Sequence, residues 1–186
     1  KYYELGNIIM FSIRILISLC SLFVVNSEFI QINGIINKKN TDFFFQQVED
    51  IRQKGYHVKY KIYFDTPGGS VLDGMRILSF IETHEVECHA TRAYSMGFVL
   101  FQACKERKIE KYGSLMQHDM QLNLNYVNYH RFQSYYKYIS KIYKTLIDKQ
   151  ISKLGISKKK FLNKIKDDWW INAQDAIYYN CADEII

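Results

Sequence analysis

The sequence has few of the residues that break regular structure, with one proline and nine glycines among 186 residues. Its four cysteines form no Cys-x-x-Cys pair, which argues against a zinc knuckle or a redox dithiol, and we expect them to be structural thiols. The composition also lacks the signature of disorder, because 48% of the residues are hydrophobic and 24% are charged. A chain of this length and composition is expected to fold as one domain with a sizeable core.

No aromatic-plus-glycine RNA-binding motif accompanies the positive charge, which is a net +6 at pH 7. This charge is concentrated in residues 137–166, which hold ten lysines and a single acid, Asp148. Such a stretch is usually the solvated face of a helix, so we expect no nucleic-acid partner. The sequence also points to no metal ion and no organic cofactor.

An apolar run at residues 15–25 is shorter than the roughly 18 residues of a membrane-spanning helix and matches the core of a signal peptide. A buried N-terminal helix would have the same length and remains an equal alternative. We therefore divide the chain into a hydrophobic N-terminal segment, residues 1–27, and a folded domain, residues 28–186. If residues 10–27 act as a signal, the protein is secretory, organellar or membrane-associated; otherwise it is cytoplasmic.

Strand and helix patterns alternate along the folded domain. Ile30 and Ile32 alternate with polar residues, as in a half-buried strand, and a helix capped by Thr41 and ending near Gly55 is expected next. From Tyr129 to Leu146, apolar residues recur three and four positions apart and predict a long helix, and no glycine or proline interrupts residues 119–154. The alternation predicts an α/β domain built of right-handed βαβ crossovers. Further strands are expected at residues 58–64, 86–90, 108–112, 115–118 and 182–186, and further helices at 72–81, 97–101, from 157, and at 172–179.

Ser95 occupies the most informative position in the sequence. It lies in the segment AYSMG, residues 93–97, between a strand-like stretch and an apolar, helix-like run. A hydroxyl at the N-terminus of a helix can face a polarised carbonyl group, which suggests acyl-transfer chemistry.

A second turn, DTPGGS at residues 65–70, follows another strand-like stretch. Its paired glycines allow backbone N–H groups to approach a ligand closely, as an oxyanion hole requires. Ser70 is a rival nucleophile, but its position favours a role as the cap of the next helix.

These motifs resemble those of the proteolytic subunits of the Clp protease, the ClpP family. The resemblance extends from Phe29 to Ile186 and rests on several motifs in the same order. It implies a crotonase-like superhelix of ββα units with a long projecting helix, and a serine endopeptidase that cleaves unfolded chains through an acyl-enzyme. The motifs are TPGGS at residues 66–70, AYSMG at 93–97, MQH at 116–118, GIS at 155–157 and DWWINA at 168–173.

The resemblance also implies roles for individual residues. Ser95 matches the nucleophile, His118 the general base and Asp168 the carboxylate that orients the histidine. A serine hydroxyl needs an imidazole to take its proton, and the imidazole needs a partner that fixes its tautomer. The neighbouring Asp167 and Asp119 remain alternatives for the acid.

The backbone N–H groups of Gly69 and Met96 match the donors of the family's oxyanion hole. The resemblance further implies a peptide substrate and a ring-shaped homo-oligomer. The segment after His118 and the apolar N-terminus depart from the family pattern, so ring stacking and an AAA+ unfoldase partner are implied only weakly. Tyr94 replaces a small residue, and we expect the pocket beside Ser95 to be narrower or more polar as a result.

Two other functions remain open. One is a membrane-linked serine protease like signal peptide peptidase A or the NfeD-associated proteases, which would use a lysine beside Ser95. The other is an inactive ring subunit that only assembles or regulates. A hydratase acting on acyl-coenzyme A is disfavoured because it would not need a serine in this context.

A second apolar stripe flanks the predicted core face of the long helix. It consists of Tyr135, Tyr138 and Ile142, which would otherwise meet water. We therefore expect this helix to pack between protomers. The predicted core face itself is formed by Tyr129, Phe132, Tyr136, Ile139, Tyr143 and Leu146.

Overall fold

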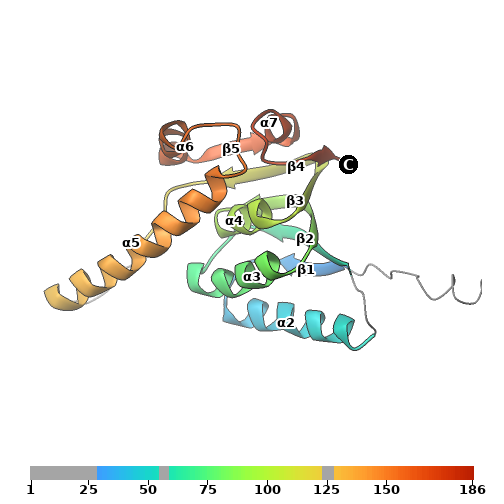
Figure 1. Ribbon diagram of the computed structural model, residues 1–186, viewed down its shortest axis with the longest axis horizontal. Coiled ribbons are helices and arrows are strands. Elements are labelled where there is room, and N and C mark those ends of the chain that lie inside the picture. The colour runs from blue at the N-terminus through green and yellow to red at the C-terminus, as the bar shows by residue number, and fades with distance from the viewer. Residues whose placement is uncertain (1–28, 55–58, 123–127) are drawn as a thin grey trace, which may run out of the picture.

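A computed structural model describes residues 29–54, 59–122 and 128–186. The N-terminal segment of residues 1–27 and Gly55, where a helix was expected to end, lie outside these ranges. The described chain forms one six-stranded sheet with helices packed on it, and α5 projects away from it (Figure 1). Among the described helices, none is both long and apolar enough to cross a membrane.

The sheet is mainly parallel, which fits the predicted α/β class. Four strands lie side by side in chain order, β5 pairs antiparallel with the free edge of β4, and β6 pairs parallel with β4. Strand β4 is continuous where two short strands were expected. The strands are β1 Phe29–Asn33, β2 Tyr60–Thr66, β3 Val86–Tyr94, β4 Glu106–Gln117, β5 Trp169–Asn172 and β6 Glu184–Ile185.

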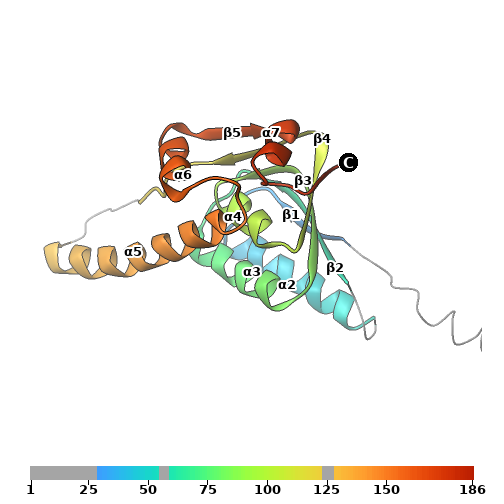
Figure 2. The same cartoon turned by 45° about the horizontal axis from the view of Figure 1, so that its top comes forward.

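The helices follow the strands to which they are connected. Helices α2, α3 and α4 succeed β1, β2 and β3, and they lie next to one another on one side of the sheet (Figures 1 and 2). Helices α6 and α7 flank β5 (Figure 2). The helices are α2 Lys38–Arg52, α3 Val71–Thr83, α4 Met96–Ala103, α5 Tyr129–Ile151, α6 Lys158–Lys164 and α7 Ala173–Tyr178, with a 3₁₀ turn at Ile165–Asp167.

The helix starts are set by short polar side chains. Ser70 caps α3 as expected, since its side chain accepts a hydrogen bond from the Asp73 N–H at 3.2 Å. The expected cap of α2 is wrong: Asn37 caps it, accepting from the Asn40 N–H at 2.9 Å. Thr41 instead lies inside the first turn and is fully buried, because β1 ends at Asn33 and the helix begins earlier than the pattern suggested.

The core between sheet and helices is built from alternating strand residues and one face of each helix. Ile30 and Ile32 are 0% and 6% exposed, which confirms the alternation predicted for β1. The same alternation buries Ile62 and Phe64 of β2. Burial of this apolar surface is the main favourable contribution to folding.

Helix α5 projects from the domain (Figure 1). It carries several exposed aromatic side chains. Tyr135 and Tyr138 are 40% and 52% exposed, as expected for a stripe that the domain itself does not cover. The predicted core face is wrong over the N-terminal half of α5, because Tyr129, Phe132 and Tyr136 are exposed as well. Ile142, which was assigned to the same stripe, is buried at 7% exposure. That assignment is wrong because the C-terminal half of α5 packs against α4, and Ile142 lies within this half.

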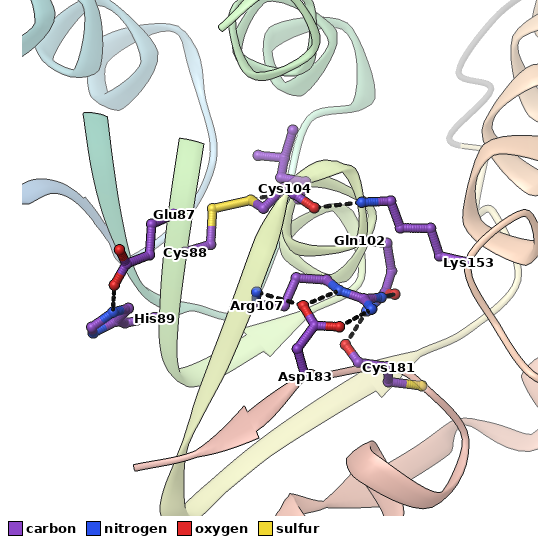
Figure 3. Close-up of a disulfide and its surroundings, with 10 residues drawn as sticks. Glu87, Cys88, His89, Gln102, Cys104, Arg107, Lys153, Cys181 and Asp183 are labelled. Atoms are coloured by element: carbon purple, nitrogen blue, oxygen red, sulfur yellow. Dashed lines mark hydrogen bonds and ion pairs between the residues drawn. A yellow bond between two sulfur atoms is a disulfide. The ribbon is translucent and has the colours of Figure 1, made fainter. Parts of the chain in front are cut away.

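Cys88 of β3 and Cys104, the residue after α4, form a disulfide with a Cα–Cα distance of 6.0 Å (Figure 3). The expectation of structural thiols is wrong for this pair and correct for Cys181, which is free and buried. The end of α4 returns to the beginning of β3, so Cys88 and Cys104, 16 residues apart in sequence, come into contact. No local sequence motif indicates this contact. Burial raises the pKa of the Cys181 thiol to about 12.

The C-terminal segment is tied to the sheet by Arg107, which is only 3% exposed. Its guanidinium donates to the Asp183 carboxylate and to Gln102 Oε1 at 2.8 Å (Figure 3). It also donates to the Asn180 carbonyl at 3.0 Å. A buried guanidinium is stable only when its donors are satisfied in this way. The Lys153 ammonium lies beside this network and donates to the Cys104 carbonyl at 2.6 Å.

Candidate active site

Ser95 lies at the sharp turn between β3 and α4. Its φ of 53° falls in a region that non-glycine residues rarely adopt, and such strain is often found at functional sites. The Ser95 N–H donates to the Met116 carbonyl at 2.8 Å, which fixes the turn against β4. The turn also requires Gly68, because a Cβ there would lie 2.7 Å from the Ser95 Cβ.

His118 follows the last residue of β4 and contacts Ser95 directly. Its Nε2 lies 2.8 Å from Ser95 Oγ, and both residues are partly buried. The register of the parallel pair β3–β4 produces this contact, since it sets Tyr94 opposite Met116 and so ends both strands at the same edge. With Nε2 unprotonated, the imidazole is placed to accept the serine proton.

Asp168 immediately precedes β5, the strand that pairs with the end of β4. The antiparallel pair β4–β5 sets Gln117 opposite Trp169, and continuing that register by one residue sets His118 opposite Asp168. Asp168 is exposed and has a φ of 49°. Within the described residues no hydrogen bond joins the Asp168 carboxylate to the imidazole, so the structure brings together Ser95 and His118 but not the third residue.

The two alternative acids differ in their surroundings. Asp119 is exposed, and its carboxylate interacts with the Tyr143 hydroxyl. Burial and this interaction raise the pKa of Tyr143 to about 12. Asp167 is exposed at the end of the 3₁₀ turn. In the parts of the chain that the structure describes, neither carboxylate hydrogen-bonds the His118 ring.

Of the two expected oxyanion donors, Met96 directly follows Ser95, and Gly69 follows Gly68, which packs against Ser95. Met96 is the first residue of α4, so its N–H has no acceptor within the helix, and Gly69 has a φ of 146°. A Cβ at Gly69 would lie 2.2 Å from the Ile36 carbonyl oxygen, so the close approach requires glycine. Neither N–H donates a hydrogen bond to any residue of the described ranges.

The turn that holds Gly69 is organised by a buried threonine. Thr66 Oγ1 accepts from the Gly68 N–H at 3.0 Å and donates to the Gly34 carbonyl at 2.6 Å. The Thr66 methyl group also packs against Gly97, where a Cβ would lie 2.6 Å away. Thr66 therefore positions both the glycine turn and the first turn of α4.

Ser95 and His118 lie at a small, open cleft with a volume of about 50 Å³. Most of its wall is apolar, formed by Val71, Met96, Val99, Met120, Leu146 and Ile147. Tyr94 is not part of this wall, so the expectation that it makes the pocket narrower or more polar is wrong. Alternation along β3 turns its ring to the other face, where it packs edge-on against Trp170 with ring centroids 5.1 Å apart.

Sequence reasoning missed two polar residues of the cleft, Gln117 and Gln150. A glutamine is common on protein surfaces, so neither residue stands out in the sequence. The alternation along β4 could have indicated that Gln117 is buried, because Gln117 is two residues from the buried Leu115 and hence on the same face of the strand.

Comparisons with known proteins identify the family. The sequence matches the family model described as Clp protease over residues 18–186. The chain therefore belongs to the Clp protease family and is a ClpP-like peptidase, and its mixed α/β architecture fits that family. An ATP-dependent Clp protease proteolytic subunit from Borreliella afzelii (strain PKo) is 23% identical over 172 residues, which cover 88% of this chain and 85% of that protein.

Proposed function

We propose that this protein is a serine endopeptidase that hydrolyses peptide bonds of unfolded proteins or peptides through an acyl-enzyme. Ser95 is the nucleophile, His118 the general base and Asp168 the residue that orients the imidazole. The observation that carries the proposal is the 2.8 Å contact between Ser95 Oγ and His118 Nε2 at a strand–helix turn. A histidine rather than a lysine in contact with Ser95 favours this function over a serine–lysine protease.

The reaction proceeds in two balanced halves. In the first, His118 Nε2 takes the proton of the Ser95 hydroxyl as Oγ bonds to the substrate carbonyl carbon. The former carbonyl oxygen becomes negatively charged, and the N–H groups of Gly69 and Met96 stabilise it. The imidazolium then gives its proton to the leaving amine as the C–N bond breaks. In the second half, water attacks the acyl-enzyme with the same histidine as base, and Ser95 regains its proton.

Asp168 acts on the imidazole rather than on the substrate. Its position immediately before β5 supports this role, because β5 pairs antiparallel with the end of β4 and His118 directly follows that end. A carboxylate accepting from Nδ1–H keeps Nε2 free to take the serine proton and stabilises the imidazolium.

The active particle in this proposal is a ring-shaped homo-oligomer. The exposed aromatic residues of α5 support it, because a projecting helix rich in exposed aromatic side chains is typical of a protein interface. The Borreliella relative is named ATP-dependent, and an AAA+ unfoldase is accordingly the partner that we propose for delivery of folded substrates.

The test is active-site labelling combined with peptide hydrolysis. A fluorophosphonate should label the wild-type protein on Ser95, and the Ser95→Ala variant should not be labelled. The rate at which this variant hydrolyses a fluorogenic peptide should be lower by roughly 10³-fold or more. Ser70→Ala is the matched control, because it removes the rival hydroxyl, which only caps α3. Labelling of Ser70, or full activity of Ser95→Ala, would contradict the proposal.

A further inference from the structure

Two buried glutamines interrupt the apolar wall of the cleft beside Ser95. Gln117, the last residue of β4, is 5% exposed, and Gln150, near the end of α5, is 2% exposed. Both line the same hollow as Ser95 and His118. Burying two carboxamides in a wall that is otherwise mostly aliphatic costs free energy, because each polar group loses its hydrogen bonds to water.

The pair forms a chain of hydrogen bonds from α5 to the backbone of His118. Gln150 Nε2 donates to the Leu146 carbonyl at 2.9 Å, and Gln117 Nε2 donates to Gln150 Oε1. Gln117 Oε1 in turn accepts from the His118 N–H at 3.2 Å. These bonds fix the orientation of both carboxamides.

The chain leaves part of each carboxamide unused. A carboxamide has two N–H donors and an oxygen that accepts two hydrogen bonds. In the described structure, each of the two side chains uses one donor and one acceptor position. Gln117 and Gln150 therefore each retain one donor and one acceptor position beside a cleft that opens next to the nucleophile.

Packing alone does not explain this arrangement. Two aliphatic residues of similar volume would fill the same space without burying unused donors and acceptors, and such replacements are often neutral or stabilising. The spare hydrogen-bonding capacity is useful only if another group enters the cleft to meet it.

We propose that Gln117 and Gln150 are specificity-determining residues that select substrates with a carboxamide side chain, glutamine above all, at the residue whose carbonyl is attacked. This inference rests on the proposed function, because it is the acylation of Ser95 that brings this side chain to the cleft. The aliphatic wall contacts the methylene groups of the substrate glutamine. Its carboxamide donates to one cleft glutamine and accepts from the other.

Other side chains of similar length fit this site less well. Norleucine has the right length but leaves the donors and acceptors of the pair unmet. A glutamate carboxylate accepts hydrogen bonds but cannot donate, and its charge would be desolvated. A lysine could be drawn to Asp119, which also lines the cleft and interacts with the Tyr143 hydroxyl.

The experiment compares four fluorogenic peptides that differ only at this residue, carrying glutamine, norleucine, glutamate or lysine. The full-length wild-type protein should cleave the glutamine peptide with the highest kcat/KM. In the double variant Gln117→Leu/Gln150→Met, the ratio of kcat/KM for glutamine over norleucine should fall about 10-fold or more. The ratio is independent of how much of the variant is folded, because both peptides are measured on the same preparation.

Gln133→Leu is the matched control, since Gln133 is an exposed glutamine of α5 that does not line the cleft. It should leave the ratio unchanged. If the double variant does not accumulate, Gln150→Met alone should lower the same ratio, because it removes one partner of the substrate carboxamide.

The two proposals fail in different ways. If no peptide is cleaved, or cleavage persists in Ser95→Ala, the proposed function is wrong. If cleavage depends on Ser95 but the double variant changes the ratio by less than about twofold, the glutamine pair does not select the substrate. A preference for lysine that Asp119→Asn abolishes would assign the selection to Asp119 and overturn the inference.

Discussion

Reducing the Cys88–Cys104 disulfide should destabilise the protein by about 3 kcal/mol. The bond closes a segment with a sequence separation of 16 residues. For a loop of that size, the loss of chain entropy in the unfolded state corresponds to roughly 10 cal/mol/K, or about 3 kcal/mol at 25 °C. For a chain of this length, the same difference lowers Tm by about 6–12 °C.

The effect should also reach the candidate active site. The closed segment contains the end of β3, the Ser95 turn and the whole of α4. The disulfide therefore limits how far the turn can open in partly unfolded states. Activity should consequently fall at lower temperature in the reduced protein than in the oxidised protein.

The assay is urea unfolding of the wild-type protein with and without a dithiol, at one protein concentration. Cys88 and Cys104 are both 0% exposed, so the dithiol reduces the disulfide in the unfolded chain and leaves the folded protein largely oxidised. The double variant Cys88→Ala/Cys104→Ala should be insensitive to the dithiol, and Cys181→Ala should respond like the wild type. An equal unfolding midpoint for wild type with and without dithiol would refute the reasoning, as would a peptide map without the Cys88–Cys104 link.

Three further predictions concern the acid, the assembly and the charges on the sheet. Asp168→Asn should lower kcat roughly 10³-fold or more, whereas Asp167→Asn and Asp119→Asn should change it only a few-fold; a larger loss from either of these would move the orienting role to it. Tyr138→Glu should dissociate the oligomer in analytical ultracentrifugation while the exposed Lys144→Glu does not, and an intact particle in both would exclude α5 from the interface. Burial opposes ionisation of Glu87, but hydrogen bonds from His89, Lys108 and Lys59 outweigh it and lower its pKa to about 2. The carboxylate thus stabilises the fold above pH 4.5 and loses this effect as pH falls toward 2, so the unfolding free energy of Glu87→Gln should depend less on pH in that window.

Local patterns were sufficient for most elements of the fold. The alternation of β1, the cap at Ser70 and the uninterrupted helix near residues 129–151 each depend on neighbours in sequence, and the structure confirms them. Two of the failures have a common cause. The Cys88–Cys104 bond and the burial of Ile142 depend on which elements pack together, and the sequence of a single element carries no such information.

In the candidate site, too, the residues within local motifs were predicted and those brought together by packing were missed. Ser95 and His118 each stand at the end of a strand within a recognisable motif, and the structure brings them into contact. The glutamine pair was missed because Gln117 and Gln150 are 33 residues apart and come from a strand and a helix. Their partnership exists only after α5 packs beside β4, so no spacing in the sequence indicates it.

The topology of the sheet explains why the site forms where it does. Parallel strands present their carboxyl ends at one edge, and ligands bind there in open α/β sheets. The Gly69 turn after β2, Ser95 after β3 and His118 after β4 all follow strand ends at this edge. Strand β5 is antiparallel to β4, so its beginning rather than its end lies there, and Asp168 immediately precedes it. A mainly parallel sheet with one antiparallel strand thus gathers residues from four strands at one edge, and a one-residue slip of β5 would place Asp167 or Trp169 opposite His118 instead.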